Sequence, residues 1–210
     1  ICCFRGSKES TKRRVCWELT TDCNLNCPFC HRYKDDIKYY NVGDLDNTVS
    51  ILKKQKIADV IISGGEPFLH PSIYEILERL YREGFSIDIC TNGILIDQTV
   101  VCKLKPYLSE ISISIDSYNA ARHERMRATS KCFEKTLNAI NLLQDKGLDV
   151  HTVTVVDESY IAELIPMVEF LNSINIKSMT FIGLIPINTG NNPLLRDDVQ
   201  LEIVENLNKA

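Results

Sequence analysis

Short runs of apolar, β-branched residues alternate with longer amphipathic stretches along nearly the whole chain. The apolar runs at 15–20, 59–63, 85–90, 110–116, 150–156 and 178–185 predict six β-strands. Stretches with apolar residues three and four positions apart predict helices at 44–56, 71–84, 97–104, 133–146, 160–173 and 197–209. Six strand–helix units in series indicate parallel strands that are joined by right-handed crossovers.

Two α/β architectures fit this order of elements, a doubly wound sheet and a partial barrel, and periodicity alone does not distinguish them. The chain has 210 residues, which is short for a closed eightfold barrel, since such a barrel usually needs about 250 residues. In both architectures the ligand-binding loops follow the carboxyl ends of the strands. Residues that carry chemistry are therefore expected directly after each strand.

Composition and charge exclude several classes of protein. With 24 basic and 28 acidic residues the net charge is −4, which does not favour a nucleic-acid partner. No apolar run reaches the roughly 18 residues of a membrane span, and basic residues crowd the first fourteen positions where a signal peptide would need an apolar core. The cysteines are clustered rather than spread like a disulfide framework, so we expect a cytoplasmic protein.

The strongest chemical signal is the C-x3-C-x2-C spacing of Cys23, Cys27 and Cys30, immediately after the first predicted strand. Three thiolates within eight residues can converge on a soft-metal centre such as an iron–sulfur cluster. A cubane cluster with three protein ligands leaves one iron open for a substrate or cofactor. The alternatives are a structural zinc site with His31 as its fourth ligand, and three buried cysteines without a metal.

Polar and glycine residues also follow the next three predicted strands. Gly64 and Gly65 allow a ligand to approach the backbone closely, Glu66 can accept hydrogen bonds from an ammonium group, and Pro67 stiffens the turn. Thr91-Asn92-Gly93 follows the third strand, and Ser114-Ile115-Asp116 ends the fourth. Each segment is also compatible with an ordinary turn. Among the other cysteines, Cys16, Cys90, Cys102 and Cys132 are expected to behave as small buried hydrophobes.

The cysteine spacing, with the aromatic Phe29 before its last member, resembles the signature of the radical S-adenosylmethionine (SAM) superfamily. The segment 64–67 matches the GGEP motif of that superfamily in full, and Thr91-Asn92-Gly93 and Ser114-Ile115-Asp116 extend the resemblance. The resemblance covers most of the chain, about 15–188, and each of these segments falls at the carboxyl end of a predicted strand. The resemblance implies a partial (β/α)6 TIM-like barrel of parallel strands.

The resemblance also implies the cofactors. Cys23, Cys27 and Cys30 would ligate three irons of a [4Fe–4S] cluster, and the amino and carboxylate groups of SAM would bind the fourth. Reduction of the cluster would cleave SAM to methionine and a 5′-deoxyadenosyl radical, which abstracts hydrogen from a substrate. The cofactor-binding residues implied in this way are Phe29, Gly64, Gly65, Glu66, Pro67, Asn92, Ser114, Asp116, Arg127, Thr154 and Leu184.

The chain departs from the family pattern at two places. Arg127 stands where similar enzymes place an arginine that contacts the SAM carboxylate, but 128–132 follow it instead of glycines. Tyr160 stands where a related subset carries an asparagine. Thr154 and Leu184 are implied to contact the adenosine part of SAM from the fifth and sixth strands.

We expect an N-terminal extension over 1–13 and a radical SAM domain over 14–210. Related peptide-modifying enzymes often carry a cysteine-rich C-terminal SPASM or twitch domain, and none is expected here because no cysteine follows Cys132. The resemblance implies a peptide or a small cofactor- or nucleotide-type substrate, and an electron donor such as flavodoxin or ferredoxin. The alternative from another class is a non-catalytic α/β binding module that is stabilised by zinc or a cluster.

Overall fold

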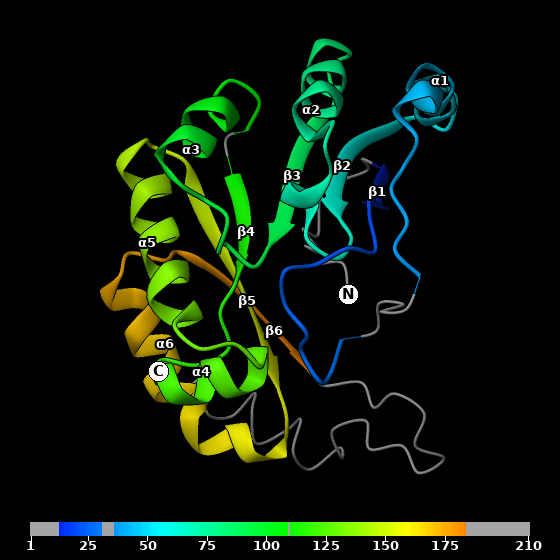
Figure 1. Ribbon diagram of the computed structural model, residues 1–210. Coiled ribbons are helices and arrows are strands. Elements are labelled where there is room, and N and C mark those ends of the chain that lie inside the picture. Colours follow the sequence, from blue (N-terminus) through cyan, green and yellow to red (C-terminus); the bar gives the residue numbers. More distant parts are fainter. Residues whose placement is uncertain (1–12, 31–35, 109, 184–210) are drawn as a thin grey trace.

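The computed structural model describes residues 13–30, 36–108 and 110–183, with the exception of the side chains of 158, 159 and 161 (Figure 1). Six parallel strands form one sheet, and their order in the sheet follows their order in the chain. The strands are β1 (Arg13–Glu18), β2 (Ile57–Ser63), β3 (Ser86–Thr91), β4 (Glu110–Ser114), β5 (Asp149–Val156) and β6 (Ser178–Gly183). A doubly wound sheet reverses its strand order at a switch point. The topology therefore selects the partial (β/α)6 barrel, with β1 and β6 as its two edges.

The helices lie along the outer side of the curled sheet (Figure 1). They are α1 (Leu45–Lys54), α2 (Ile73–Arg82), α3 (Gln98–Leu104), α4 (Ala120–Arg127), α5 (Cys132–Asp145) and α6 (Leu164–Ser173), with short 3-10 turns η1 (Val42–Asp44), η2 (Pro67–Leu69) and η3 (Glu158–Glu163). Helix α4 has no counterpart among the predicted helices. The predicted helix at 197–209 lies outside the described residues. No helix in the described ranges is both long and apolar enough to cross a membrane.

The outer face of the sheet carries the hydrophobic core. Ile62, Ile89 and Ile113 are completely buried there and pack with helix residues such as Leu80 and Ile140. Each fully buried side chain of this size contributes about 1.5–3 kcal/mol relative to exposure. This apolar layer fixes the side of the sheet on which the helices pack, and it leaves the other face for the lumen of the barrel.

The inner face of the sheet carries several polar side chains, which is unusual because the interior of a complete barrel is filled by branched apolar side chains. Cys90 and Ser114 line an inner pocket, so Asp88 and Ser112, two residues earlier on β3 and β4, share their face. The Ser112 hydroxyl lies 3.0 Å from an Asp88 carboxylate oxygen. On β5 the His151 ring pairs with hydroxyls of β6. An open half-barrel tolerates these polar groups because they bond to one another.

One cysteine of the first strand differs from expectation. Cys16 is disulfide-bonded rather than free, and its partner lies outside the described residues. None of the other described cysteines, Cys23, Cys27, Cys30, Cys90, Cys102 and Cys132, is disulfide-bonded. The cysteines of the C-x3-C-x2-C segment are thus available for a metal.

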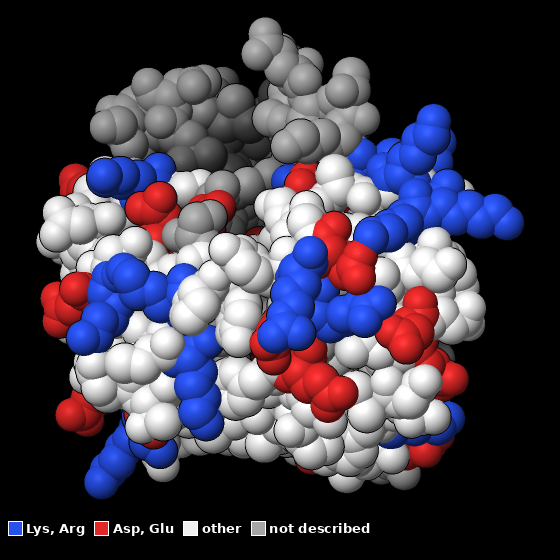
Figure 2. All heavy atoms as spheres, turned by 90° about the horizontal axis from the view of Figure 1, so that it is seen from above, with Lys and Arg blue, Asp and Glu red and all other residues white. Residues whose placement is uncertain are grey.

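The face seen in Figure 2 carries basic and acidic side chains that are mixed rather than separated by sign. On α2, Arg79 lies 3.1 Å from Asp46 of α1 and 3.2 Å from Glu83, and Lys53 pairs with Glu83 as well. Exposed ion pairs of this kind each contribute about 0–1 kcal/mol. They tie α1 to α2 without contributing much to stability.

Candidate cofactor site

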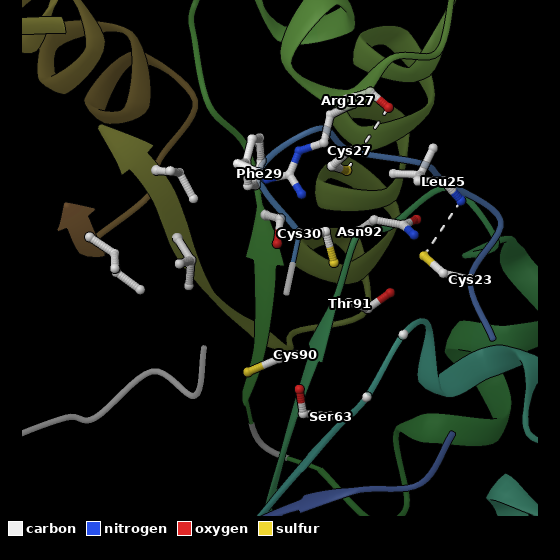
Figure 3. Close-up of a pocket in the computed structure, with 16 residues that line it drawn as sticks. Cys23, Leu25, Cys27, Phe29, Cys30, Ser63, Cys90, Thr91, Asn92 and Arg127 are labelled. Atoms are coloured by element: carbon white, nitrogen blue, oxygen red, sulfur yellow. Dashed lines mark hydrogen bonds between the residues drawn. The ribbon is translucent and has the colours of Figure 1, made fainter. Parts of the chain in front are cut away.

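The loops after β1 to β4 and the ends of β5 and β6 meet around one pocket (Figure 3). Convergence at the carboxyl ends of parallel strands follows from the fold, because all six strands point the same way. The residues that line this pocket are Cys23, Leu25, Cys27, Phe29, Cys30, Ser63, Gly64, Gly65, Cys90, Thr91, Asn92, Ser114, Arg127, Val153, Val155 and Ile182. Nine of the fourteen residues that the sequence analysis assigns to the cluster or SAM are therefore here: Cys23, Cys27, Cys30, Phe29, Gly64, Gly65, Asn92, Ser114 and Arg127.

The segment 22–30, which we call the cysteine loop, brings three thiols to this pocket. Cys23 and Cys30 are half-buried, and Cys27 is 6% exposed. The Leu25 N–H donates to Cys23 Sγ at 3.4 Å, and the Cys27 thiol lies 3.9 Å from the carbonyl oxygen of Arg127. Burial raises the pKa of the Cys27 thiol, an effect that the neighbouring Arg127 partly offsets.

The donor set of the loop fits an iron–sulfur cluster. Three cysteines without a disulfide line one pocket, and thiolate sulfur is the ligand that such clusters use. Within the described ranges no three histidine, cysteine or acidic side chains are drawn together into a preassembled metal site. The loop therefore presents the right ligands, and their convergence on a metal requires a change in the side-chain positions. His31, the fourth ligand of the zinc alternative, lies outside the described residues.

The two glycines of the GGEP segment serve a contact between loops. The Gly65 N–H donates to the Thr20 carbonyl at 2.6 Å and the Glu66 N–H to the Asp22 carbonyl at 2.7 Å, which continues the pairing of β1 with β2 beyond both strands. A Cβ atom on Gly65 would lie 1.9 Å from the Asp22 oxygen, and one on Gly64 would lie 2.4 Å from the Thr20 oxygen. Gly64 also has a φ of +140°, which other residues rarely adopt. The glycines thus bring the chain against the start of the cysteine loop, in addition to lining the pocket.

Glu66 is completely buried and does not line the pocket. Its carboxylate accepts hydrogen bonds from the Thr91 hydroxyl at 2.7 Å, from the Asn92 N–H at 3.0 Å and from the Phe68 N–H at 3.4 Å. Burial raises the pKa of Glu66 to about 7, and these hydrogen bonds act in the opposite direction. In this structure Glu66 joins the loop after β2 to the loop after β3, so its expected contact with the SAM ammonium stays a prediction. Pro67 is buried at the start of η2.

Asn92 connects the loop after β3 to the cysteine loop. Its side-chain nitrogen donates to Asn24 Oδ1 at 2.7 Å, and its side-chain oxygen accepts from the Ile94 N–H at 2.9 Å. Its backbone carbonyl accepts from the Thr136 hydroxyl at 3.1 Å. Asn92 therefore lies in the pocket wall with both side-chain ends already engaged.

Asp116 and Arg127 form a buried ion pair beside the pocket. The Arg127 Nε and Nη2 atoms lie 2.5 Å and 2.8 Å from the two Asp116 oxygens, and the residues are 8% and 0% exposed. The Val155 N–H also donates to Asp116 Oδ1, at 3.1 Å. Arg127 lines the pocket, with its guanidinium 5.5 Å from the centre of the Phe29 ring, whereas Asp116 does not line it. The structure thus brings Arg127, and not Asp116, to the pocket surface.

The segment after Arg127 keeps a glycine-like backbone without glycine. Ala128 and Lys131 have φ values of 50° and 59°, in the left-handed region. A residue other than glycine pays about 1 kcal/mol for this conformation. The absence of the family's glycines therefore has not displaced Arg127 from the pocket.

The structure does not bring Thr154 to the pocket. Val153 and Val155 line it, and neighbouring strand residues face opposite sides of a sheet, so Thr154 faces the helices. Its hydroxyl donates to the Ile115 carbonyl at 2.7 Å. Tyr160 is also absent from the pocket lining; it is buried with the Arg122 guanidinium 5.1 Å from its ring centre. Leu184 lies outside the described residues.

Sequence reasoning missed several residues of the pocket wall. Ser63 and Cys90 lie at the end of the pocket away from the cysteine loop (Figure 3). Each is the last residue of a predicted strand, and each faces the inside of the barrel. Strand alternation would have identified them once the inner face was known. Val153, Val155 and Ile182 form an apolar wall. Nothing in their residue types distinguishes them from core residues.

The chain matches the family model described as the Radical SAM superfamily over residues 17–171. Among curated proteins it is 29% identical to an AdoMet-dependent heme synthase of Methanosarcina barkeri, over 85% of this chain and 52% of that protein. It is 30% identical to the antilisterial bacteriocin subtilosin biosynthesis protein AlbA of Bacillus subtilis, over 79% of this chain and 38% of that protein. The chain thus spans about half or less of the length of these relatives.

Solved structures share the fold. SuiB of Streptococcus suis, in a crystal structure with bound S-adenosylmethionine, superposes with a TM-score of 0.80 at 16% identity, covering 94% of this chain and 47% of that one. The protein anSMEcpe with bound AdoMet superposes with a TM-score of 0.78 at 19% identity, covering 93% of this chain and 58% of that one. At these identities the likeness establishes the half-barrel fold and nothing more specific.

Proposed function

The chain belongs to the radical SAM superfamily, whose cofactors are a [4Fe–4S] cluster and SAM, and from this premise we propose that it is the catalytic domain of a radical SAM enzyme. The observation that carries the proposal is the set of three cysteines, none in a disulfide, that line one pocket together with a buried arginine and two glycines. Cys23, Cys27 and Cys30 would hold the cluster. When bound, the two cofactors supply reductive cleavage of SAM to methionine and a 5′-deoxyadenosyl radical that abstracts hydrogen from a substrate.

The other residues of the pocket would orient SAM. Arg127 is the one cationic side chain among the described residues that line the pocket, so we assign it to the SAM carboxylate. The backbone of Gly64 and Gly65 would lie along the methionine part, and Asn92 and Ser114 offer polar groups for it or for the ribose. Phe29 would contact the adenine through its backbone.

The apolar wall would limit the access of water. Val153, Val155 and Ile182 place hydrocarbon on the β5–β6 side of the pocket. Exclusion of water protects a reactive species from side reactions and strengthens the polar contacts that remain. The domain would in this way direct the radical to the substrate that enters the lumen.

We propose a peptide or a small cofactor- or nucleotide-type molecule as the substrate. Relatives include heme synthases, a probable GTP 3′,8-cyclase and the bacteriocin biosynthesis protein. Structural neighbours include SuiB bound to its precursor peptide SuiA and anSMEcpe bound to AdoMet and a peptide. An electron donor such as flavodoxin or ferredoxin would reduce the cluster in the cell.

The test is anaerobic reconstitution with iron and sulfide, followed by dithionite and SAM. We expect 5′-deoxyadenosine, detected by chromatography and mass spectrometry, and we expect its loss in Cys23→Ala, Cys27→Ala and Cys30→Ala. Cys102→Ala is the matched control, because Cys102 is an exposed thiol on α3 that does not line the pocket. A chain that binds zinc without iron or sulfide, or a reconstituted cluster that does not cleave SAM, would contradict the proposal and favour the binding module.

A further inference from the structure

Both oxygens of the Asp116 carboxylate are hydrogen-bonded inside the protein. Its two oxygens accept from Arg127 Nε, from Arg127 Nη2 and from the Val155 N–H, at 2.5, 2.8 and 3.1 Å. The side chain is 0% exposed and does not line the pocket. A ligand in the pocket would reach Asp116 only if these bonds were broken. This geometry argues against a direct contact between Asp116 and SAM.

The same geometry determines which part of Arg127 is left for a ligand. Nε and Nη2 are bonded to Asp116, so of the three guanidinium nitrogens Nη1 is the one outside this pair. The planar, bidentate pairing holds the guanidinium in one orientation, which a single hydrogen bond would not do. Because Arg127 lines the pocket, Asp116 sets the direction in which its remaining edge points, beside the Cys27 thiol.

Arg127 also contacts the second half of the cysteine loop. Its guanidinium lies 5.5 Å from the centre of the Phe29 ring, and its backbone carbonyl lies 3.9 Å from the Cys27 sulfur. In Figure 3 the labelled Arg127 lies beside Phe29 and Cys27 at one end of the pocket. A guanidinium within about 6 Å of an aromatic ring centre is attracted to the face of the ring. The contacts therefore run in one chain from β5 through Asp116 and Arg127 to the cysteine loop.

We infer that Asp116 is a positioning residue, which acts through Arg127 to hold the Cys27–Cys30 half of the cysteine loop and to aim one edge of the guanidinium at the ligand carboxylate. The part that concerns the carboxylate of SAM rests on the proposed function. The part that concerns the loop depends only on the chain itself. Two measurements separate these parts.

The first measurement is alkylation of the purified chain before reconstitution, with the rate at each cysteine followed by mass spectrometry. Asp116→Asn and Arg127→Lys are expected to raise the rate at Cys27 by about fivefold or more, because the buried loop opens locally. The rate at Cys23 should stay within about twofold, since Asn24 and Asn92 hold that half. Arg122→Lys is the matched control, because Arg122 lies on the same helix and pairs with Glu163 at 3.1 Å.

Arg127→Lys keeps the charge and removes the planar fork, so it reports on positioning even if Asp116→Asn, which leaves a buried charge unpaired, does not fold. Circular dichroism establishes which variants are folded. An unchanged Cys27 rate in the folded variants would overturn the inference. So would an equal acceleration at Cys23 and Cys27, because that would mean general destabilisation.

The second measurement is SAM binding to the reconstituted protein by calorimetry, in a double-mutant cycle of Asp116→Asn and Arg127→Met. Each single change should raise Kd about tenfold, and the double variant should match Arg127→Met within about twofold, because Asp116 acts only through Arg127. Additive losses would show an independent contact of Asp116 with SAM and overturn the inference. If the wild-type protein does not bind SAM, the proposed function fails, and the alkylation rates still decide the role in the loop.

Discussion

The two halves of the cysteine loop are held by different kinds of contact. The half around Cys23 is joined to the loop after β2 by backbone hydrogen bonds of Gly65 and Glu66, which form only because Gly65 has no side chain. The half around Cys27 is held by Arg127, whose position depends on the carboxylate of Asp116. The first contact is neutral and depends on Gly65 having no side chain, whereas the second is charged and depends on the side chains of Asp116 and Arg127.

This difference determines how each joint fails. Any side chain at Gly65 must displace backbone, since the Asp22 oxygen occupies the position of a Cβ. The Asp116–Arg127 pair fails when one charge is left buried without its partner. The first joint is therefore sensitive to volume, and the second to charge and geometry.

The largest effect is expected from Gly65→Ala. Its Cβ would lie 1.9 Å from the Asp22 oxygen, and overpacking against backbone should lower the free energy of unfolding by roughly 3 kcal/mol. The iron content after reconstitution should fall as well, because Cys23 directly follows Asp22. Denaturant unfolding and iron analysis measure the two effects.

Gly43→Ala is the matched control for this change. Its Cβ would meet the flexible side chain of Asn41, at 3.2 Å or more. We expect its free energy of unfolding to change by no more than about 0.5 kcal/mol. If Gly65→Ala behaved like Gly43→Ala, the backbone joint would not be the contact that holds the first half.

Two buried groups, Glu66 beside the first half of the loop and His123 beside the Asp116–Arg127 pair, should make the stability of the chain depend on pH in opposite directions. The pKa of Glu66 is raised from 4.5 to about 7 by burial, so the folded chain binds more protons than the unfolded chain in this range and stability falls as pH rises. The pKa of His123, whose Nδ1 accepts the Asp116 N–H, is lowered from 6.5 to about 4 by burial. The unfolded chain then binds more protons between these values, and stability rises with pH.

Each group changes the free energy of unfolding by about 3 kcal/mol across its pH range, and two variants separate these opposing contributions. Glu66→Gln should leave the rise that is due to His123 between pH 4 and 6.5, and His123→Asn should leave the fall that is due to Glu66 between pH 4.5 and 7. In the wild-type chain the two largely cancel over the shared range. Urea unfolding of the metal-free chain at a series of pH values measures the slopes, and equal slopes in the two variants would contradict the assignment.

The smallest effect is expected from Thr154→Val, on the outer face of β5. The change removes the hydrogen bond to the Ile115 carbonyl, which should cost about 1 kcal/mol of stability. SAM affinity should stay within about twofold, because the side chain faces away from the pocket. A much larger loss of affinity would restore the expectation that Thr154 contacts the adenosine.

The strand–helix alternation predicted most of the fold, because apolar runs and helical spacing follow directly from which residues are buried. Helix α4 was not predicted, because its buried residues are His123 and Arg127, which give no apolar periodicity. The sequence also did not predict which side of β5 faces the pocket. Both faces of that strand are buried, so alternation between polar and apolar residues does not mark the inner one.

The sequence by itself determined the ligand types and their order: three thiols after β1, two glycines after β2, and polar residues after β3 and β4. Local spacing suffices for these, because each motif lies within one loop. Only the tertiary structure decided that Glu66 bonds to the segment after β3, and Asp116 to α4 and β5, rather than facing the pocket. Cys27 and Arg127 are 100 residues apart in the chain, and the curl of the sheet is what places them in contact. Contacts between residues so far apart in the sequence depend on how the strands assemble, and a local sequence pattern does not predict this.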